Sequence, residues 1–473
     1  GTISTVKLEY STDGGATYPN VIATLVNAAT GTPYAWTIPD NLSTTVRVKV
    51  TNEADSTVLS NSTNNLTIKG SLTLTAPNGG EAWVVSATQN ITWTKVGSIA
   101  NVKLEYSTNG GTTYPNLIVA STSGATLSYA WTVPDAIGTQ LKVKITDLAN
   151  TNVLDESNAN FTIKGSVTLT SPVGSETWYV GENRNITWTR TGSFINVKLE
   201  YSTNGFFNEL QTAVIAASTP AATGTYAWTV PDAIGANLKV RISDAADATV
   251  VAVSTGPFII KGKLQLTSPV GGETWIVGQI QNIIWARTGS IANAKLEYSI
   301  DGGLTYPNTI ITSTPAVTGT YAWTVPDAIG IQVRVRVSDV SDATVFSTST
   351  ANFTIKGSLT VTAPNGGEVW VVNSAHDITW TKTGTISTVK LEYSTNGFSD
   401  ELQTVIIIAS TDATGTPASS YKYTWTIPDA ISSAVKVRIT NNADASVTDR
   451  SDTNFKITGA FILTSPNGAE QWT

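Results

Sequence analysis

The chain has 473 residues, of which 41% are hydrophobic and only 13% are charged, and its formal net charge is −7. This length exceeds what one sandwich core needs, and the composition is that of a folded chain. The sequence has no basic stripe, no cysteine and no apolar run of about 18 residues, which argues against a nucleic-acid binder, disulfides, thiolate metal sites and a membrane-spanning helix.

A segment of the type Lys-Gly-Ser-Leu-Thr-Leu-Thr returns along the chain and sets its period. Its glycines, at positions 70, 165, 262, 357 and 459, are successively 95, 97, 95 and 102 residues apart. A period of about 100 residues is too long for a solenoid coil and has the size of a whole sandwich domain. We therefore predict a tandem array of similar domains.

Within each period, short segments alternate between apolar and polar residues, as Val102-Lys103-Leu104-Glu105-Tyr106 does. This alternation is typical of strands in antiparallel sheets that pack on one face and meet solvent on the other. The pattern predicts an all-β fold of seven-stranded, antiparallel immunoglobulin-like β-sandwiches, with tryptophans in the core. In the second period the expected strands are 71–76, 90–95, 102–108, 113–121, 127–133, 140–147 and 158–164, and the expected core tryptophans are Trp83, Trp93 and Trp131.

The spacing predicts five repeats, which we number in chain order. The first lacks its first two strands, because Gly1 to Val6 aligns with Gly97 to Val102, and the tail aligns with the start of the second repeat. Two interpretations remain open: the chain is a window from a longer array, or the tail of one molecule completes the open head of the next by strand donation. The predicted ranges are 1–70, 71–165, 166–262, 263–357 and 358–459, with 460–473 as the first strand of a further repeat.

The junctions between repeats are unusually short. The last strand of the second repeat passes through Lys164-Gly165 directly into Val167-Thr168-Leu169, with no Pro-rich or Gly/Ser-rich linker. We therefore expect neighbouring repeats to touch and the array to be stiff. A Pro-Asp pair also recurs, ending at Asp135, Asp232, Asp327 and Asp429. Aspartate bonds readily to its own backbone, so we interpret these residues as closing turns.

A family resemblance rests on three strings of the sequence. They are Leu-Thr-Ser-Pro-x-Gly-Gly-Glu-Thr-Trp-x-Val-Gly at 266–278, Ile-Thr-Trp at 186–188 and Tyr-Ser-Ile-Asp-Gly-Gly-x-Thr-Tyr at 298–306. Together they resemble the immunoglobulin-like or fibronectin type III-like tandem repeat of large secreted bacterial surface proteins. They are also similar to the N-terminal domain of the yeast cell-wall glucan assembly family, the Ser/Thr-rich surface-anchored group. The resemblance implies secreted, surface-associated proteins and carries over no catalytic residues.

Catalytic chemistry has few candidate residues, so we expect no enzyme. The only histidine is His376, which occurs in one repeat, and the recurrent carboxylates are better explained as turn residues than as parts of a mechanism. Calcium is the chemical alternative, because clustered oxygen ligands on a loop suit this ion. The weak candidate ligands are Asp244, Asp247, Asp339 and Asp342.

Self-association into a homopolymer or bundle is the partner that we expect, because outer faces rich in threonine and poor in charge repel one another weakly. Candidate contacts are Phe206, Phe207 and Phe398, on loops that depart from the Gly-Gly-x-Thr-Tyr turn of the other repeats. A cell-surface polysaccharide is a second possible partner. Its candidate stacking residues are Tyr18, Tyr114, Tyr306 and Phe207.

The sequence thus predicts a structural, extracellular or cell-surface protein. We expect a stiff rod that forms part of a fibre, sheath, stalk or adhesin shaft. The alternative is an accessory carbohydrate-binding or spacer region of a larger secreted enzyme.

Overall fold

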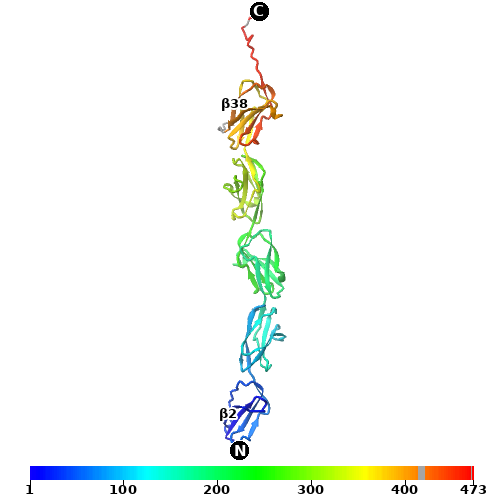
Figure 1. Cartoon of the computed structure of the whole chain (residues 1–473), viewed down its shortest axis with the longest axis vertical. Coiled ribbons are helices and arrows are strands. Elements are labelled where there is room, and N and C mark those ends of the chain that lie inside the picture. Colours follow the sequence, from blue (N-terminus) through cyan, green and yellow to red (C-terminus); the bar gives the residue numbers. More distant parts are fainter. Residues whose placement is uncertain (414–420, 470, 473) are drawn as a thin grey trace. The chain divides into compact units, whose positions relative to one another are not determined.

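The computed structural model describes residues 1–473 except 414–420, 470 and 473. Two compact units divide the chain, and they are not placed relative to one another. The first unit comprises Gly1–Glu176, Asn183–Trp228 and Ala236–Ile259, and the second comprises Thr177–Glu182, Thr229–Gly235 and Ile260–Thr473. Figure 1 shows that both are built from strands, which confirms the predicted all-β class of tandem sandwiches.

The second repeat shows how each complete repeat is built. One sheet has three strands in the order β11-β8-β6, and the other has the order β10-β9-β12-β14-β7, with β13 paired to β12. Strands β7 and β14 pair in parallel, and the other strand pairs of this repeat are antiparallel. The bounds are β6 (Ser71–Ala76), β7 (Ala82–Val84), β8 (Thr88–Val96), β9 (Asn101–Ser107), β10 (Asn116–Ser123), β11 (Ser128–Thr132), β12 (Gly138–Asp147), β13 (Leu154–Glu156) and β14 (Phe161–Lys164).

The third repeat has the same two sheets, with orders β15-β17-β20 and β16-β23-β21-β18-β19, and β22 paired to β21. It adds two short 3₁₀ helices. The bounds are β15 (Ser166–Ser171), β16 (Thr177–Tyr179), β17 (Asn183–Thr191), β18 (Asn196–Ser202), η1 (Glu209–Gln211), β19 (Thr212–Pro220), η2 (Ala221–Thr223), β20 (Thr225–Thr229), β21 (Gly235–Asp244), β22 (Val251–Val253) and β23 (Phe258–Lys261).

The fourth repeat repeats this topology once more, in the orders β24-β26-β29 and β25-β32-β30-β27-β28, with β31 paired to β30. Its bounds are β24 (Lys263–Ser268), β25 (Thr274–Ile276), β26 (Ile280–Thr288), β27 (Asn293–Ser299), β28 (Asn308–Pro315), η3 (Ala316–Thr318), β29 (Thr320–Thr324), β30 (Gly330–Asp339), β31 (Phe346–Thr348) and β32 (Phe353–Lys356).

The fifth repeat has the orders β33-β35-β38 and β34-β41-β39-β36-β37, with β40 paired to β39. Its bounds are β33 (Ser358–Ala363), β34 (Val369–Val371), β35 (Ala375–Thr383), β36 (Thr388–Ser394), η4 (Glu401–Gln403), β37 (Thr404–Asp412), β38 (Tyr421–Thr426), β39 (Ser432–Asn441), β40 (Thr448–Arg450) and β41 (Phe455–Thr458).

The first repeat differs, because its described strands form one sheet in the order β2-β1-β3-β4, with β5 paired to β3. Its buried core is correspondingly small and consists of Tyr10, Val46 and Ile68. The bounds are β1 (Thr5–Ser11), β2 (Asn20–Asn27), β3 (Ser43–Asn52), β4 (Leu59–Asn61) and β5 (Leu66–Ile68).

The described residues of the tail, 460–469, 471 and 472, belong to no strand. Phe461, Ile462 and Leu463 there are exposed. In every complete repeat the first strand pairs with a strand that follows it in sequence. The assignment of 460–473 as the first strand of a further repeat therefore stays a prediction.

The core of a complete repeat is aromatic, as expected. In the second repeat Trp83, Trp93 and Trp131 are 7%, 2% and 6% exposed. The ring of Trp83 lies 5.9 Å from that of Trp131 and 5.2 Å from that of Phe161, so it joins the two sheets. Each buried ring removes roughly 150–250 Å² from water. Among the described residues, no helix has the length and apolar character needed to cross a bilayer.

Candidate functional site

A short glycine linker connects each repeat to the next and is pressed against the following repeat. We call Gly70, Gly165, Gly262 and Gly357 the linker glycines. A Cβ atom at Gly70 would lie 2.5 Å from the Val96 carbonyl oxygen, and one at Gly262 would lie 2.7 Å from the Ile291 side chain. Real Cβ atoms do not approach so closely, so only glycine fits. The linker is therefore part of a packed junction.

The surface that receives each linker is a loop of the following repeat. We call these four loops the receptor loops. Each begins with a glycine at positive φ, between +74° and +93°, and its large apolar residue is 1–6% exposed. A cation two residues before the glycine braces the loop: Arg287, for example, donates to the carbonyls of Gly289 and Ile291 at 3.2 and 2.8 Å. The receptor loops are Gly97-Ser98-Ile99, Gly192-Ser193-Phe194, Gly289-Ser290-Ile291 and Gly384-Thr385-Ile386.

An aspartate of the preceding repeat closes every receptor loop, and we call these residues the latch aspartates. The carboxylate accepts a hydrogen bond from the backbone N–H of the loop serine or threonine. The donor–acceptor distances are 2.7 Å for Asp40 and Ser98, 3.1 Å for Asp135 and Ser193, 3.0 Å for Asp232 and Ser290, and 2.9 Å for Asp327 and Thr385.

The loop hydroxyl adds a second bond at three of these four junctions. Ser98 Oγ donates to Asp40 at 2.5 Å, Ser290 Oγ donates to Asp232 at 3.0 Å, and Thr385 Oγ1 donates to Asp327 at 2.5 Å. The bonds from Ser98 lower the pKa of Asp40 below its ordinary value. A charged acceptor strengthens such bonds, although solvent exposure weakens them.

Apolar groups of the preceding repeat flank each latch. Beside Gly289, the side chains of Val180 and Ile234 would lie 3.0 and 3.2 Å from an added Cβ. Beside Gly384, Val277 and Ile329 occupy the same places at 3.0 Å. Each junction thus combines a hydrogen bond to the latch aspartate with apolar contacts beside it. Together they fix the position of the receptor loop.

The Pro-Asp aspartates therefore act differently from our prediction. We expected each to close a turn through its own backbone, yet the side chain of Asp135 bonds Ser193 of the next repeat. A constant spacing in the sequence could have predicted this contact, because the latch aspartate and its loop serine or threonine are always 58 residues apart. Local turn chemistry obscures this spacing, since Pro-Asp suits a turn as well.

A lysine forms a further contact across three junctions. Lys261 Nζ lies 2.9 Å from Asp342 Oδ2, Lys356 Nζ lies 3.3 Å from Asp444 Oδ2, and Lys164 donates to Thr249 at 3.3 Å. Each lysine directly precedes its linker glycine in the sequence.

The four candidate calcium ligands lie at the last residues of β21 and β30 and in the loops that follow, where they accept bonds from neighbouring groups. Asp244 and Asp339 accept from backbone N–H groups at 2.9 and 2.8 Å. Asp247 and Asp342 accept from the backbone N–H and hydroxyl of the threonine two residues later. Among the described residues, no group of three or more His, Cys, Asp and Glu is placed to hold a metal ion. Calcium binding stays a prediction, and at Asp342 it competes with Lys261.

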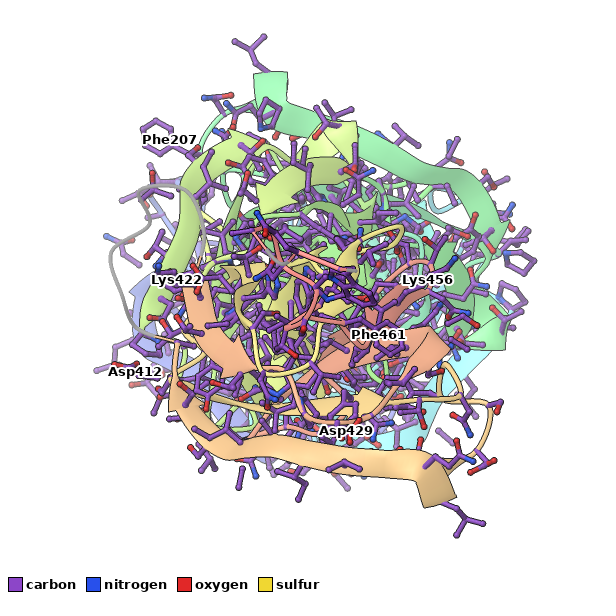
Figure 2. All side chains as sticks on the ribbon, turned by 90° about the horizontal axis from the view of Figure 1, so that it is seen from above. Phe207, Asp412, Lys422, Asp429, Lys456 and Phe461 are labelled. Atoms are coloured by element: carbon purple, nitrogen blue, oxygen red, sulfur yellow. The ribbon has the colours of Figure 1, made fainter. Side chains whose placement is uncertain are left out.

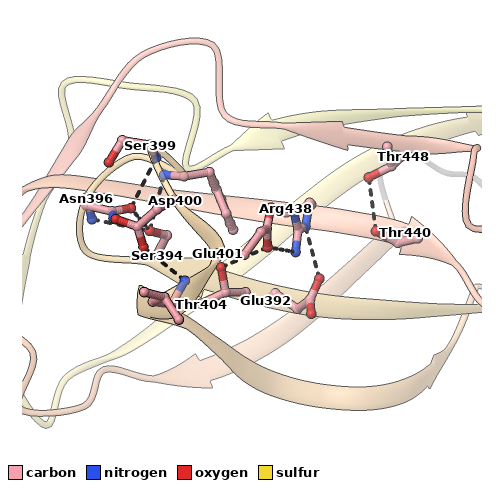
Figure 3. A network of polar contacts seen from close by, with 12 residues as sticks. Glu392, Ser394, Asn396, Ser399, Asp400, Glu401, Thr404, Arg438, Thr440 and Thr448 are labelled. Carbon is pink, nitrogen blue, oxygen red and sulfur yellow. Dashed lines mark hydrogen bonds and ion pairs between the residues drawn. The ribbon is translucent and has the colours of Figure 1, made fainter.

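A second polar feature, an arginine between two glutamates, recurs on the hairpin side of the third and fifth repeats, and Figure 3 shows it in the fifth repeat. Arg438 lies between Glu392 and Glu401, with N–O distances of 3.0 Å to the first and 2.8 and 2.9 Å to the second. These bonds to Arg438 lower the pKa of Glu401. The guanidinium also covers the ring of Phe398 at 4.6 Å. The arrangement holds the short helix η4 against the sheet.

The three phenylalanines predicted as self-association contacts are not equivalent. Phe398 is 9% exposed beneath Arg438, and Phe206 is half-buried with Arg241 4.6 Å above its ring. Phe207 is 89% exposed, and its side chain lies outside the ribbon in Figure 2. Self-association through these residues stays a prediction, and Phe207 is the one that offers a free ring.

The tyrosines considered for polysaccharide stacking are half-buried and carry cations on one ring face. Lys49 lies 4.6 Å from the ring of Tyr18, and Arg336 lies 4.5 Å from that of Tyr306. Tyr114 is covered by Lys144 and donates its hydroxyl hydrogen to Glu156. One face of each ring is therefore already occupied.

The only histidine lies in the fifth repeat, on β35. His376 stacks on Trp370 with ring centroids 4.5 Å apart. Trp370 is a core side chain of the fifth repeat that contacts Trp425 on the other sheet. Packing against this ring therefore explains His376.

No family model matches the chain, and no curated protein matches it. Among solved structures, the Clostridium thermocellum CbhA fibronectin(III)-like modules are 22% identical over 40% of this chain and 94% of that chain, with a TM-score of 0.16. The Sidekick-1 immunoglobulin domains 1–5 are 9% identical over 96% and 93% of the two chains, with a TM-score of 0.23. A structure determined for Dscam isoform specificity is 11% identical over 82% and 100%, with a TM-score of 0.23.

Proposed function

We propose that this chain is a structural extracellular protein whose repeats are coupled into a stiff array. Such an array serves as part of a fibre, sheath, stalk or adhesin shaft. The observation that supports this proposal is the junction itself: four times, a latch aspartate bonds a receptor loop 58 residues later. A flexible string of independent domains has no need for the same interdomain bond at every step.

The packing of the linker explains how the junction restricts bending. A hinge needs rotation about the few residues that join two bodies, but the linker glycines have no free space around Cα. An exposed hydrogen bond alone contributes little, because water competes for both partners. At each junction the bond acts together with the buried receptor-loop side chain, so neighbouring repeats are held by several contacts at once.

The amino-acid composition supports an extracellular location for this protein. The chain has no cysteine and no methionine, so its surface carries neither of the two sulfur side chains that oxidants attack first. The similarity to secreted bacterial and yeast cell-wall repeats, which rests on sequence strings, points the same way and stays a prediction. The alternative of an accessory polysaccharide-binding region has less support, because the candidate tyrosines are capped by cations.

Distance measurements between spin labels test the coupling. The chain has no native cysteine, so Leu117→Cys and Val214→Cys place one label on the second repeat and one on the third, at exposed positions. We expect a narrow distance distribution in the parent and one at least about twofold broader after Asp135→Ala. Asp55→Ala, which removes an aspartate bonded within its own loop, is the matched control and leaves the width unchanged. A broad distribution in the parent would overturn the proposal.

A further inference from the structure

The fourth repeat has the arginine that lies between two glutamates in the third and fifth repeats, but it lacks the second glutamate. Arg336 on β30 lies opposite Glu297 on β27, in the register that the corresponding pairs of the third and fifth repeats also have. Its Nε and Nη2 donate to Glu297 Oε2 at 3.2 and 2.7 Å. Among the described residues, no other carboxylate is paired with Arg336.

In the third and fifth repeats the outer edge of this guanidinium is occupied. Arg241 donates through Nη1 and Nη2 to the two oxygens of Glu209 at 2.8 and 3.0 Å. Figure 3 shows Arg438 and Glu401 in the same geometry, at 2.8 and 2.9 Å. Both glutamates lie on the short helices η1 and η4, where the fourth repeat has its Gly-Gly-x-Thr-Tyr turn. The Arg336 side chain is accordingly 32% exposed, whereas its two counterparts are 23% and 22% exposed.

The guanidinium of Arg336 is held in place in the same way as its two counterparts. It lies 4.5 Å from the ring centroid of Tyr306, and the corresponding arginines lie 4.6 Å from the rings of Phe206 and Phe398. Glu297, which is 5% exposed, fixes its inner edge. Such a preorganised fork loses little entropy when a carboxylate binds to it. The fourth repeat therefore retains every part of this arrangement except the outer carboxylate.

The charges around Arg336 favour an anion. On the outward face of β27 and β30, the cations Lys295, Arg334 and Arg336 are set against the single carboxylate of Glu297. Lys295 Nζ lies 2.6 Å from Glu297 Oε1, and Arg336 takes Oε2, so both oxygens are used within the sheet. Arg334 donates through Nε to Asn352, a neutral group, at 2.7 Å. This face therefore keeps an excess of positive charge, which attracts anionic ligands.

We propose that Arg336, supported by Lys295, binds a carboxylate of an acidic polysaccharide, namely that of a uronic acid residue. The carboxylate accepts from Nη1 and Nη2 of Arg336, as Glu209 and Glu401 accept from their own arginines. This contact differs from the stacking on Tyr306 considered above, because the cation that covers the ring is here the binding group. It goes beyond the proposed structural function, since it needs no junction between repeats.

A second copy of this chain is the weaker candidate for the source of the carboxylate. The formal net charge of −7 gives two copies no overall electrostatic attraction. Many carboxylates of the chain are also bonded already. Each complete repeat has one glutamate that accepts two backbone N–H groups of its own turn, namely Glu81, Glu176, Glu273 and Glu368. A polymer of uronic acids carries a carboxylate on each sugar, so many points along it can reach one open site.

Surface plasmon resonance on immobilised polygalacturonate tests this site, at low ionic strength because salt screens surface charge pairs. The same polymer with fully methyl-esterified carboxylates is the control ligand, and we expect the chain not to bind it. We expect Arg336→Gln to weaken binding to polygalacturonate at least about fivefold. Lys422→Gln removes an exposed cation that is paired with Asp377 in the fifth repeat, and it should leave binding unchanged.

A gain of binding supplies a test that does not depend on how Arg336→Gln affects folding. Glu209→Ala removes the outer carboxylate from Arg241 and opens the same site in the third repeat, so we expect binding to increase about twofold. Asp55→Ala removes the same charge from an aspartate that is bonded within its own loop, and it is the matched control. Equal effects of the variants and their controls, or a parent that does not bind polygalacturonate, would overturn the proposal.

Sedimentation of the parent and of Arg336→Gln distinguishes the two sources of the carboxylate. We expect the two proteins to sediment alike. Self-association of the parent that is lost in the variant, without binding to the polymer, would assign the site to a second copy and contradict the inference. The spin-label distances between the second and third repeats do not involve Arg336, so the inference can fail while the proposed function stands.

Discussion

At the scale of single residues, the linker glycines show a requirement set by contact rather than by backbone angle. None of the four has a positive φ, so their backbone conformation is open to any residue. The restriction comes from the following repeat, which places an atom of its receptor loop or of the strand end before that loop within 2.5–2.7 Å of the place where a Cβ would be. The glycines of the receptor loops are restricted in both ways. Their φ is positive, and a Cβ atom there would meet side chains of the preceding repeat.

Replacing one linker glycine by alanine tests this explanation. In Gly262→Ala the new methyl group meets the Ile291 side chain at 2.7 Å and the Thr288 carbonyl at 2.8 Å, so we expect a loss of about 1–3 kcal/mol from overpacking. Calorimetry is the measurement, read on the transition of the neighbouring repeats. Gly330→Ala is the control, because its nearest atom is 4.0 Å away. Equal melting of the two variants would contradict the explanation.

At the scale of elements, the loop between β30 and β31 links the fourth repeat to the lysine that ends the third. Asp342 bonds the hydroxyl and N–H of Thr344, which fixes the loop, and turns its other oxygen to Lys261. The bonds from Thr344 and then from Lys261 lower the pKa of Asp342 from 3.8 to about 2. The loop is therefore both a local turn and part of the junction.

This lowered pKa predicts how the junction depends on pH. A carboxyl group whose pKa is lower in the folded chain contributes stability that is fully present above the unfolded value of 3.8 and is lost as the pH falls through about 2. We expect Asp342→Asn to destabilise the chain at pH 6 and to make little difference at pH 2, as measured by urea unfolding. Asp247→Asn removes the same charge from a loop with the same threonine bonds but without a described ion pair, so it should have the smaller effect at pH 6. The reverse order would refute the role of Lys261.

The strands could be read from the sequence because their alternation is local. The first predicted strand, 71–76, coincides with β6, and the long strands β8, β9 and β12 each lie within two residues of their predicted ends. The three-residue strands β7 and β13 were not predicted, since three residues are too few to show a period. The latch was missed for a different reason: its two partners are 58 residues apart, in different repeats, and neither looks unusual by itself.

At the scale of the whole molecule, lateral association depends on what the repeats present to solvent. The third and fifth repeats carry short helices whose leucines, Leu210 and Leu402, are 95% exposed. Among the described residues of these two repeats, only the third has an exposed aromatic ring next to its short helix, that of Phe207. Arg241 holds this loop in place through both oxygens of Glu209, so the apolar side chains are presented on an ordered support.

Removing the exposed ring tests this surface. We expect Phe207→Ser to reduce lateral assembly severalfold, measured by light scattering at increasing concentration, because an exposed apolar ring favours contact with another surface. The fold should be intact, since Phe207 contributes nothing to the core, and its melting temperature should equal that of the parent. Phe346→Ser, at a ring that is 53% exposed on β31, is the control. Assembly that is unaltered by Phe207→Ser would contradict the prediction.

The constant separation between latch and loop has a consequence for how such a chain changes over generations. Because each junction uses interchangeable halves, excising one whole period brings an upstream aspartate against the next downstream serine: without the second repeat, Asp40 would meet Ser193 in place of Ser98. Recombination between repeats in the gene can therefore lengthen or shorten the product while every joint keeps its fit. The number of repeats, and with it the length of the protein, can therefore change between generations without a new interface between repeats.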